Sequence, residues 1–184
     1  MKKTILKFGL ISGGISALFM FGTMPFHDKI GFDKGLYVGY TSMIISFLMV
    51  FFGVRSYRDN VCAGQIGFFK AFFVGILITL ISCACYVIAW EFLYFFFMPD
   101  VMDKYSAYIV EKMRASGQSA QAIQTSIDEM KKFKAMYDNP LINAALTFIE
   151  PFPVGLIISL ISALVLRKRR SGPTPDNSKL VEVA

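Results

Sequence analysis

The sequence predicts an all-α membrane protein: a bundle of four transmembrane helices with an extracytoplasmic two-helix amphipathic hairpin between spans three and four. Hydrophobic residues make up 55% of the 184 and charged residues 17%, whereas an ordinary soluble domain has about 45–50% apolar and about 25% charged residues. The apolar residues form four long runs instead of being spread at amphipathic spacing. Lys and Arg lie mostly on one side of these runs, which is typical of a multi-pass membrane protein.

Each run is long enough to cross a bilayer. The hydrocarbon core is about 30 Å thick and a helical residue rises about 1.5 Å, so a span needs about 20 residues. The predicted spans are residues 5–24, 36–54, 68–98 and 141–166. The runs are too long for barrel strands, so they are helices. The first run follows Met1-Lys2-Lys3 as a signal peptide would, but it exceeds the apolar core of about 7–15 residues and no small-x-small site precedes Pro25, so we expect a retained helix.

The positions of Lys and Arg orient these spans. Eleven cations and three acids fall on the side of the two termini, whereas segments 25–35 and 99–140 each have no net charge. Positive charge is held on the cytoplasmic side, so we expect both termini in the cytoplasm. The basic excess is then explained by topology, and no base-stacking aromatics interleave the basic run at 167–170. We therefore expect no nucleic-acid partner.

Segment 99–140 is the one sizeable polar segment between the spans. Apolar residues recur at helical spacing on both sides of Ser116-Gly117-Gln118-Ser119, where Gly can end one helix and Ser119 can cap the next. The segment is neutral and has no electrostatic reason to seek anionic lipid, so a folded outer cap is expected. Residues 1–170 then form a single four-span membrane domain. The tail, residues 171–184, is poor in apolar residues and is expected to be a flexible cytoplasmic segment.

Glu91 and Glu150 are the two acids inside the apolar runs, where an ionisable group is costly and is by default a functional hypothesis. Counting from the inner edge of spans three and four puts both carboxylates near the outer boundary of the hydrocarbon. One interpretation is that they are two interfacial acids in contact with water. The other is that they face each other as a protonatable or cation-binding pair.

Pro151 and Pro153 follow Glu150 inside span four. They remove two backbone donors, so a kink or a half-unwound helix is expected there. Transporters use broken helices to build ion sites, but in repeated halves, and one break favours a packing kink. Small residues recur every four positions in spans one and four, which permits close helix contact within the monomer or between copies. These stripes are Gly9, Gly13 and Ala17, and Gly155, Ser159 and Ala163.

Other chemistry-bearing residues do not form a recognisable site. His27 is the single histidine and lies beside Asp28, which is too few ligands for a metal. Cys83 and Cys85, two positions apart, point to different faces of a helix and cannot share a metal. No nucleotide-binding glycine loop or nucleophile motif is present. We expect no cofactor, no metal and no catalytic residue.

Four short segments resemble a bacterial family of four-span membrane proteins known as domain of unknown function 4199. The resemblance covers roughly Lys2 to Arg170 and is carried by Gly39-Tyr40-Thr41-Ser42-Met43, residues 53–60 (Gly-Val-Arg-Ser-Tyr-Arg-Asp-Asn), Met98-Pro99-Asp100 and residues 150–155 (Glu-Pro-Phe-Pro-Val-Gly). It implies a location in the bacterial inner (cytoplasmic) membrane and the topology given above. It brings no activity, ligand or catalytic residue.

The sequence leaves the function open among three classes. The first is a non-enzymatic multi-pass membrane protein of unknown function that acts through protein or lipid contacts, with the bilayer, a membrane-protein partner or a second copy as its partners. The alternative is a small ion- or proton-linked transport component that uses Glu91 and Glu150. An intramembrane enzyme is third. The candidate functional residues are Glu91, Glu150, Pro151 and Pro153.

Overall fold

The computed structural model describes residues 2–168, and the predicted tail at 171–184 lies outside the described residues. Every named element within them is helical, and the β-structure is one isolated bridge between Ile66 and Lys168. The elements are α1 (Lys2–Thr23), the 3-10 helix η1 (Met24–Phe26), α2 (His27–Val61), α3 (Phe68–Phe96), α4 (Val101–Ala115), α5 (Ala120–Tyr137), α6 (Pro140–Ile149) and α7 (Pro151–Leu166). The fold is therefore all-α, as predicted.

Four helical segments are long and apolar enough to cross a membrane. They run over Lys2–Phe26, Lys29–Val61, Phe68–Phe96 and Pro140–Leu166, one over each predicted span. Large apolar side chains point outward from them: Leu18 is 74% exposed and Phe69 is 83% exposed. An apolar surface of this kind suits lipid and is unfavourable in water.

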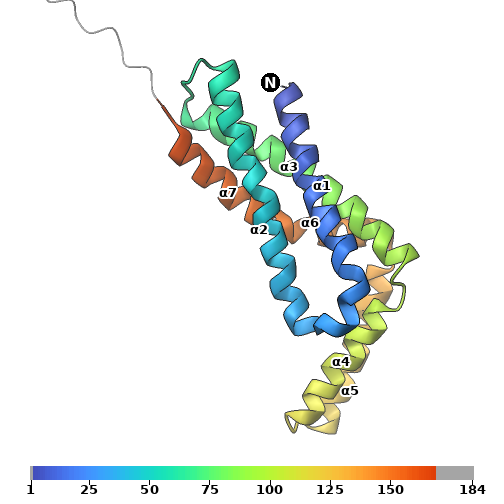
Figure 1. Ribbon diagram of the computed structural model, residues 1–184. Helices are drawn as coiled ribbons and strands as arrows, with labels where there is room; N and C mark the ends of the chain where they lie inside the picture. Colours follow the sequence, from blue (N-terminus) through green and yellow to red (C-terminus); the bar gives the residue numbers. More distant parts are fainter. Residues whose placement is uncertain (1, 169–184) are drawn as a thin grey trace, which may run out of the picture.

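Helix α3 is the centre of the bundle and packs against α1, α2 and α7 (Figure 1). Glycines let the helices approach closely. A Cβ on Gly13 would lie 2.3 Å from the Cβ of Cys85, and a Cβ on Gly155 would lie 2.3 Å from Thr79 Cγ2. Gly9 meets Ile81 in the same way. The glycines of these small-residue stripes therefore serve contacts within the monomer, the first of the two alternatives.

Buried hydroxyls link the packed helices. Ser12 Oγ donates to the Ser46 carbonyl at 2.9 Å and lies 2.8 Å from Ser82 Oγ, which joins α1, α2 and α3. Ser46 Oγ in turn donates to the Ser12 carbonyl at 2.5 Å. Thr79 Oγ1 and Ser159 Oγ, 3.0 Å apart, join α3 to α7. Each hydroxyl has a partner, so the polar groups in the middle of the bundle carry no desolvation penalty for lack of one.

Helix α2 differs from its predicted span at both ends. Segment 25–35, which lies between the first two predicted spans, is helical apart from a kink at Gly31, whose φ of 71° and ψ of 164° are non-helical. Glycine adopts this left-handed φ without the steric cost of a Cβ. At the other end α2 continues to Val61 and shortens the inner turn, which ends with Gly64 N–H donating to the Arg58 carbonyl at 2.9 Å. Tyr57, 3% exposed, is buried in this extension, which explains why the helix continues past the apolar run.

The fourth span is broken at Glu150. The residue ends α6 and precedes α7, whose first residue is Pro151. Proline is well placed at the first helical position, where its missing N–H has no partner to lose. The interruption predicted at this segment is therefore present.

The two ends of the bundle have different chemistry. The start of α1, the turn between α2 and α3 and the end of α7 lie at one end (Figure 1). There Lys168 N–H donates to the Ile66 carbonyl at 3.0 Å. This end contains the basic residues Lys2, Lys3, Lys7, Arg55, Arg58, Lys70, Arg167 and Lys168.

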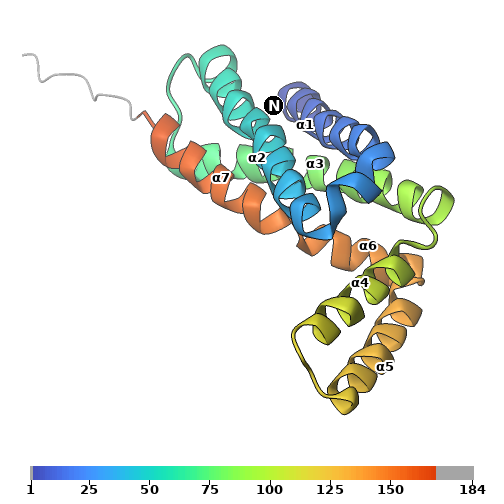
Figure 2. The ribbon, with the colours of Figure 1, turned by 60° about the horizontal axis from the view of Figure 1, so that its bottom comes forward.

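Helices α4 and α5 form a hairpin that extends from the opposite end (Figure 2). They are the two amphipathic helices predicted between spans three and four. The turn lies where expected: Gly117 has a φ of 73°, and Ser119 caps α5 by accepting a hydrogen bond from Ala122 N–H at 3.2 Å.

Candidate functional site: a cavity at the hairpin end of the bundle

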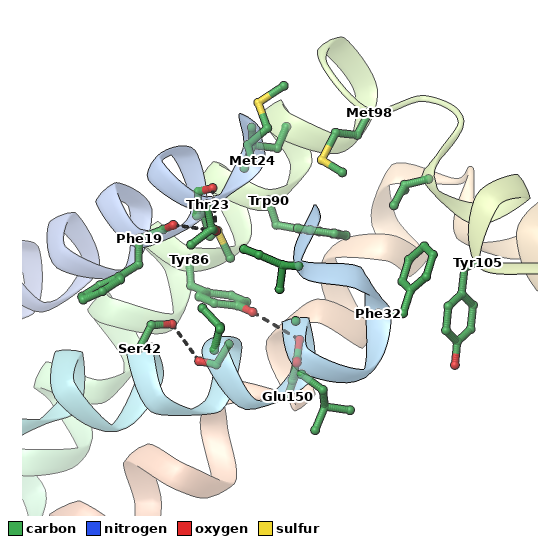
Figure 3. A pocket seen from close by; sticks show the side chains of 18 of the residues that line it. Phe19, Thr23, Met24, Phe32, Ser42, Tyr86, Trp90, Met98, Tyr105 and Glu150 are labelled. Carbon is green, nitrogen blue, oxygen red and sulfur yellow. Dashed lines mark hydrogen bonds between the residues drawn. The ribbon is translucent and has the colours of Figure 1, made fainter. Parts of the chain in front are cut away.

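A cavity of about 460 Å³ lies where the end of α1, the start of α2, α3 and the start of α4 meet (Figure 3). Most of its wall is apolar, from residues such as Met20, Met24, Leu36, Leu93 and Met102. Ligand-binding pockets have volumes of about 300–1,000 Å³ and similar walls with a few placed polar groups. We call this space the hairpin-end cavity.

Glu150 gives the hairpin-end cavity a carboxylate. Its side chain is exposed to the cavity, and Tyr86 O–H donates to Glu150 Oε2 at 3.3 Å (Figure 3). The residue stands between α6 and α7, and its side chain makes no capping hydrogen bond to α7. The helix break therefore places a charged group in an otherwise apolar space.

A chain of hydrogen bonds forms another part of the wall. Trp90 Nε1–H donates to Tyr137 OH at 2.9 Å, and Tyr137 OH lies 3.3 Å from Thr147 Oγ1. Thr147 O–H donates to Asn143 Oδ1 at 3.1 Å, and Asn143 Nδ2–H donates back to the Tyr137 carbonyl at 3.2 Å. Burial raises the pKa of the Tyr137 phenol, so it is neutral at physiological pH. The chain links α3, the end of α5 and α6.

The hairpin borders the cavity at its base and makes aromatic and ionic contacts with the start of α2. The Phe32 ring lies 5.2 Å from the Tyr105 ring and 5.3 Å from the Tyr108 ring, centroid to centroid. Lys112 Nζ donates to Asp33 Oδ1 at 3.1 Å and to Tyr108 OH at 3.2 Å. Hydrogen bonding to Tyr108 and then to Asp33 raises the pKa of Lys112, which keeps the ammonium group charged. Helix α4 is thereby held against the start of α2.

The two candidate acids differ in their surroundings. Glu91 is absent from the lining of the hairpin-end cavity, and among the described residues its buried Oε1 has no hydrogen-bond partner. Within residues 2–168 no hydrogen bond joins Glu91 to Glu150. Pro151 is buried beside Glu150, whereas Pro153 is exposed on the outside of α7. Of the four candidate residues, Glu150 is the one that lines the cavity.

Sequence reasoning did not identify the aromatic residues that accompany Glu150. Tyr86 and Trp90 are four positions apart on α3 and therefore share a face, which is a signal present in the sequence. Tyr105 and Tyr137 come from different helices of the hairpin, and no local pattern connects them to Glu150. Among the side chains that the structure describes, which do not include those of His27 and Asp28, no group of three or more His, Cys, Asp or Glu is arranged to hold a metal ion.

The fold defines an all-α protein whose described residues include four helices long and apolar enough to cross a membrane. The family described as "Protein of unknown function (DUF4199)" matches residues 7–168, and the chain belongs to this family. The resemblance stated from the sequence segments is therefore confirmed. A comparison with curated proteins gave no match, and neither did a comparison with solved structures.

Proposed function

We propose that this protein is a non-enzymatic, multi-pass component of the bacterial cytoplasmic membrane that acts by binding a lipid in the hairpin-end cavity. The observation that carries the proposal is the cavity itself: about 460 Å³ with mainly apolar walls and one carboxylate. An apolar wall favours an acyl chain, and a single charged group favours a polar headgroup at one place. Contact with lipid is thus specific at this site and general along the outer faces of the spans.

A glycine in the cavity wall supplies a direct test. Gly39 lines the cavity, and a Cβ on Gly39 would have nothing within 4 Å, so Gly39→Phe fills the cavity without a backbone clash. We expect native mass spectrometry of the detergent-purified protein to show less bound phospholipid for Gly39→Phe than for wild type. Gly14→Phe is the matched control, because Gly14 is exposed, also has nothing within 4 Å, and does not line the cavity. Equal lipid occupancy in all three proteins would contradict lipid binding in the cavity.

We further propose that both termini are cytoplasmic and that the α4–α5 hairpin is extracytoplasmic. The gathering of Lys and Arg at the end opposite the hairpin supports this orientation. Single cysteines at Gln118, in the hairpin turn, and at Asn60, near the end of α2, test it in a variant without Cys62, Cys83 and Cys85. A membrane-impermeant maleimide added to whole cells is expected to label position 118 and not position 60. Labelling of position 60 alone would reverse the orientation.

Proton- or cation-linked transport is a second candidate, favoured by the exposure of the Glu150 carboxylate to a cavity beside a helix break. If it operates, reconstituted wild-type protein carries a flux that Glu150→Gln removes. Glu91→Gln tests the other acid of the original hypothesis. A wild type with no flux across vesicles would exclude this candidate for the ions tested.

A further inference from the structure

The charge of the hairpin-end cavity has one sign. Among the described residues that line the cavity, Glu150 is the one with a charged side chain, and none is Lys or Arg. The hydrogen bond from Tyr86 uses Glu150 Oε2, so the other carboxylate oxygen retains its capacity to accept. A negative group between apolar walls is most favourable beside a positive partner, because attraction between charges is stronger where water is excluded.

Four side-chain donors in the wall, those of Thr23, Ser42, Tyr86 and Trp90, are already used, which disfavours an anionic headgroup beside them. Trp90 N–H donates to Tyr137 OH at 2.9 Å. Thr23 O–H donates to the Phe19 carbonyl at 2.8 Å, and Ser42 O–H donates to the Gly39 carbonyl at 2.7 Å. A phosphate placed there would meet a carboxylate and would have to compete for these donors.

Aromatic rings complete a site that suits a cation. Tyr86, Trp90, Phe32, Tyr105 and Tyr137 all line the cavity with Glu150. Tyr86 points at Glu150, whereas Phe32 and Tyr105 lie further from it (Figure 3). The faces of aromatic rings attract ammonium groups, most strongly where the group is desolvated. The combination of one carboxylate with several rings is the chemistry by which proteins recognise amines and quaternary ammonium groups.

We propose that the hairpin-end cavity selects a lipid whose headgroup carries an ammonium group, with Glu150 as the counter-ion and the acyl chain along the apolar wall. The ammonium group lies between Glu150 and the rings, and any phosphate stays at the mouth of the cavity. Tyr86 acts as a positioning residue that fixes the carboxylate. This inference rests on the proposed lipid binding and adds the class of headgroup.

The test compares lipids that differ at the amine. Native mass spectrometry of the full-length protein in detergent is used to titrate phosphatidylethanolamine, its N-acetylated form, phosphatidylcholine and phosphatidylglycerol, all with the same acyl chains. We expect wild type to bind phosphatidylethanolamine and phosphatidylcholine about tenfold more tightly than the two lipids without an ammonium group, a difference of about 1.4 kcal/mol. Wild-type binding without this preference would overturn the inference, and this arm needs no variant to fold.

Variants assign the preference to the residues. Glu150→Gln is expected to abolish the preference while leaving lipid bound, and Glu91→Gln, a carboxylate outside the cavity lining, is expected to retain it. Tyr86→Phe is expected to reduce the preference in part, since Phe keeps the ring and loses the hydrogen bond to Glu150. A preference that persists in Glu150→Gln would overturn the assignment of the counter-ion.

The outcomes separate this inference from the proposed function. If no lipid binds wild type, or if Gly39→Phe binds lipid as wild type does, lipid binding in the cavity fails and the inference fails with it. If lipid binds in the cavity without headgroup preference, the inference alone fails. Ethanolamine added without acyl chains is expected to leave the lipid in place, and its displacement of the lipid would show that the site takes a free amine instead.

Discussion

The two halves of the bundle use side-chain size in opposite ways. In the half towards the basic end, glycine and serine bring helices together, and Ser12, Val50, Val74 and Ser159 are fully buried. In the half towards the hairpin, a Cβ on Gly39 would meet nothing within 4 Å, and the helices enclose a cavity of about 460 Å³. The comparison teaches that glycine in a membrane helix supports close packing in one place and leaves open space in another. The residues around the glycine decide which of these two outcomes occurs.

Interruptions of the helical backbone mark the boundary between the two halves of the bundle. Pro25 and the non-helical Gly31 interrupt the connection between α1 and α2, and Glu150 interrupts the fourth span. These breaks are all near the hairpin end, where the cavity lies. In the half towards the basic end, which we call the packed half, α1, α2, α3 and α7 run without interruption. Regular helices can interdigitate over their whole length, whereas changes of direction leave space between them.

The largest effect is expected from adding volume in the packed half. Gly13→Leu forces a side chain into Cys85, whereas Gly14→Leu, one residue later, meets nothing within 4 Å. Overpacking costs about 1–3 kcal/mol or more, so we expect Gly13→Leu to unfold at clearly lower SDS concentration than wild type and Gly14→Leu to unfold close to it. Similar destabilisation by both substitutions would mean that the close contact between α1 and α3 is wrong.

The second-largest effect is expected from the loss of the hydrogen-bond chain at the hairpin end. Asn143 is fully buried, and Asn143→Ala leaves the Tyr137 carbonyl and the Thr147 hydroxyl without this partner. An unsatisfied buried polar group costs about 1–3 kcal/mol. Hydrogen exchange is expected to speed up at the end of α5, and limited proteolysis near residues 116–119 is expected to increase. Asn60→Ala, at an exposed residue of α2, is the control and should change neither measurement.

A smaller effect is expected from the serine network. Ser46→Ala removes the hydroxyl that lies 2.6 Å from Ser16 Oγ and donates to the Ser12 carbonyl. Hydrogen bonds between membrane helices contribute about 0.6 kcal/mol on average, so SDS unfolding should shift slightly but measurably. Ser42→Ala removes a hydroxyl that bonds its own helix and serves as the comparison. A loss for Ser46→Ala no greater than that for Ser42→Ala would show that the network contributes nothing to helix association.

The smallest effect is expected from the surface ion pair between Lys134 and Asp103, which joins α5 to α4. Hydrogen bonding to Asp103 raises the pKa of Lys134 above its ordinary value. Because the folded-state pKa is raised, the contribution is fully present below the ordinary lysine pKa of about 10.4 and is lost as the pH rises through the higher folded value. A double-mutant cycle with Lys134→Gln and Asp103→Asn should show coupling at neutral pH that falls with added salt. Coupling that is insensitive to salt would contradict this account.

The sequence predicts the features that depend on local pattern. Long apolar runs locate the four candidate spans, and helical spacing with Ser119 as a cap locates α4 and α5. The same logic fails at the start of α2, because segment 25–35 has charges and glycines typical of a loop. There the contacts of Phe32 with Tyr105 and Tyr108 accompany helical structure in spite of the local signal.

For the candidate site, the sequence predicts only how deep each residue lies along its helix. Counting residues at about 1.5 Å each gives the depth of Glu91 and Glu150 along a helix, but it does not give the rotation of the helix about its axis. Trp90 lines the cavity and its neighbour Glu91 does not, a difference that rotation alone decides. The cavity also requires residues of α1, α2, α3, α4 and α5 to meet Glu150, and no single stretch of sequence encodes that meeting.

The backbone hydrogen bond from Lys168 to Ile66 has a mechanical consequence. It fastens the far end of α7 to the turn between α2 and α3, so the helix cannot slide along its own axis as a piston without breaking it. Helix α7 has 16 residues and is therefore about 24 Å long. Because the far end of α7 is fastened, the length of this helix sets the position of Glu150 along the bundle.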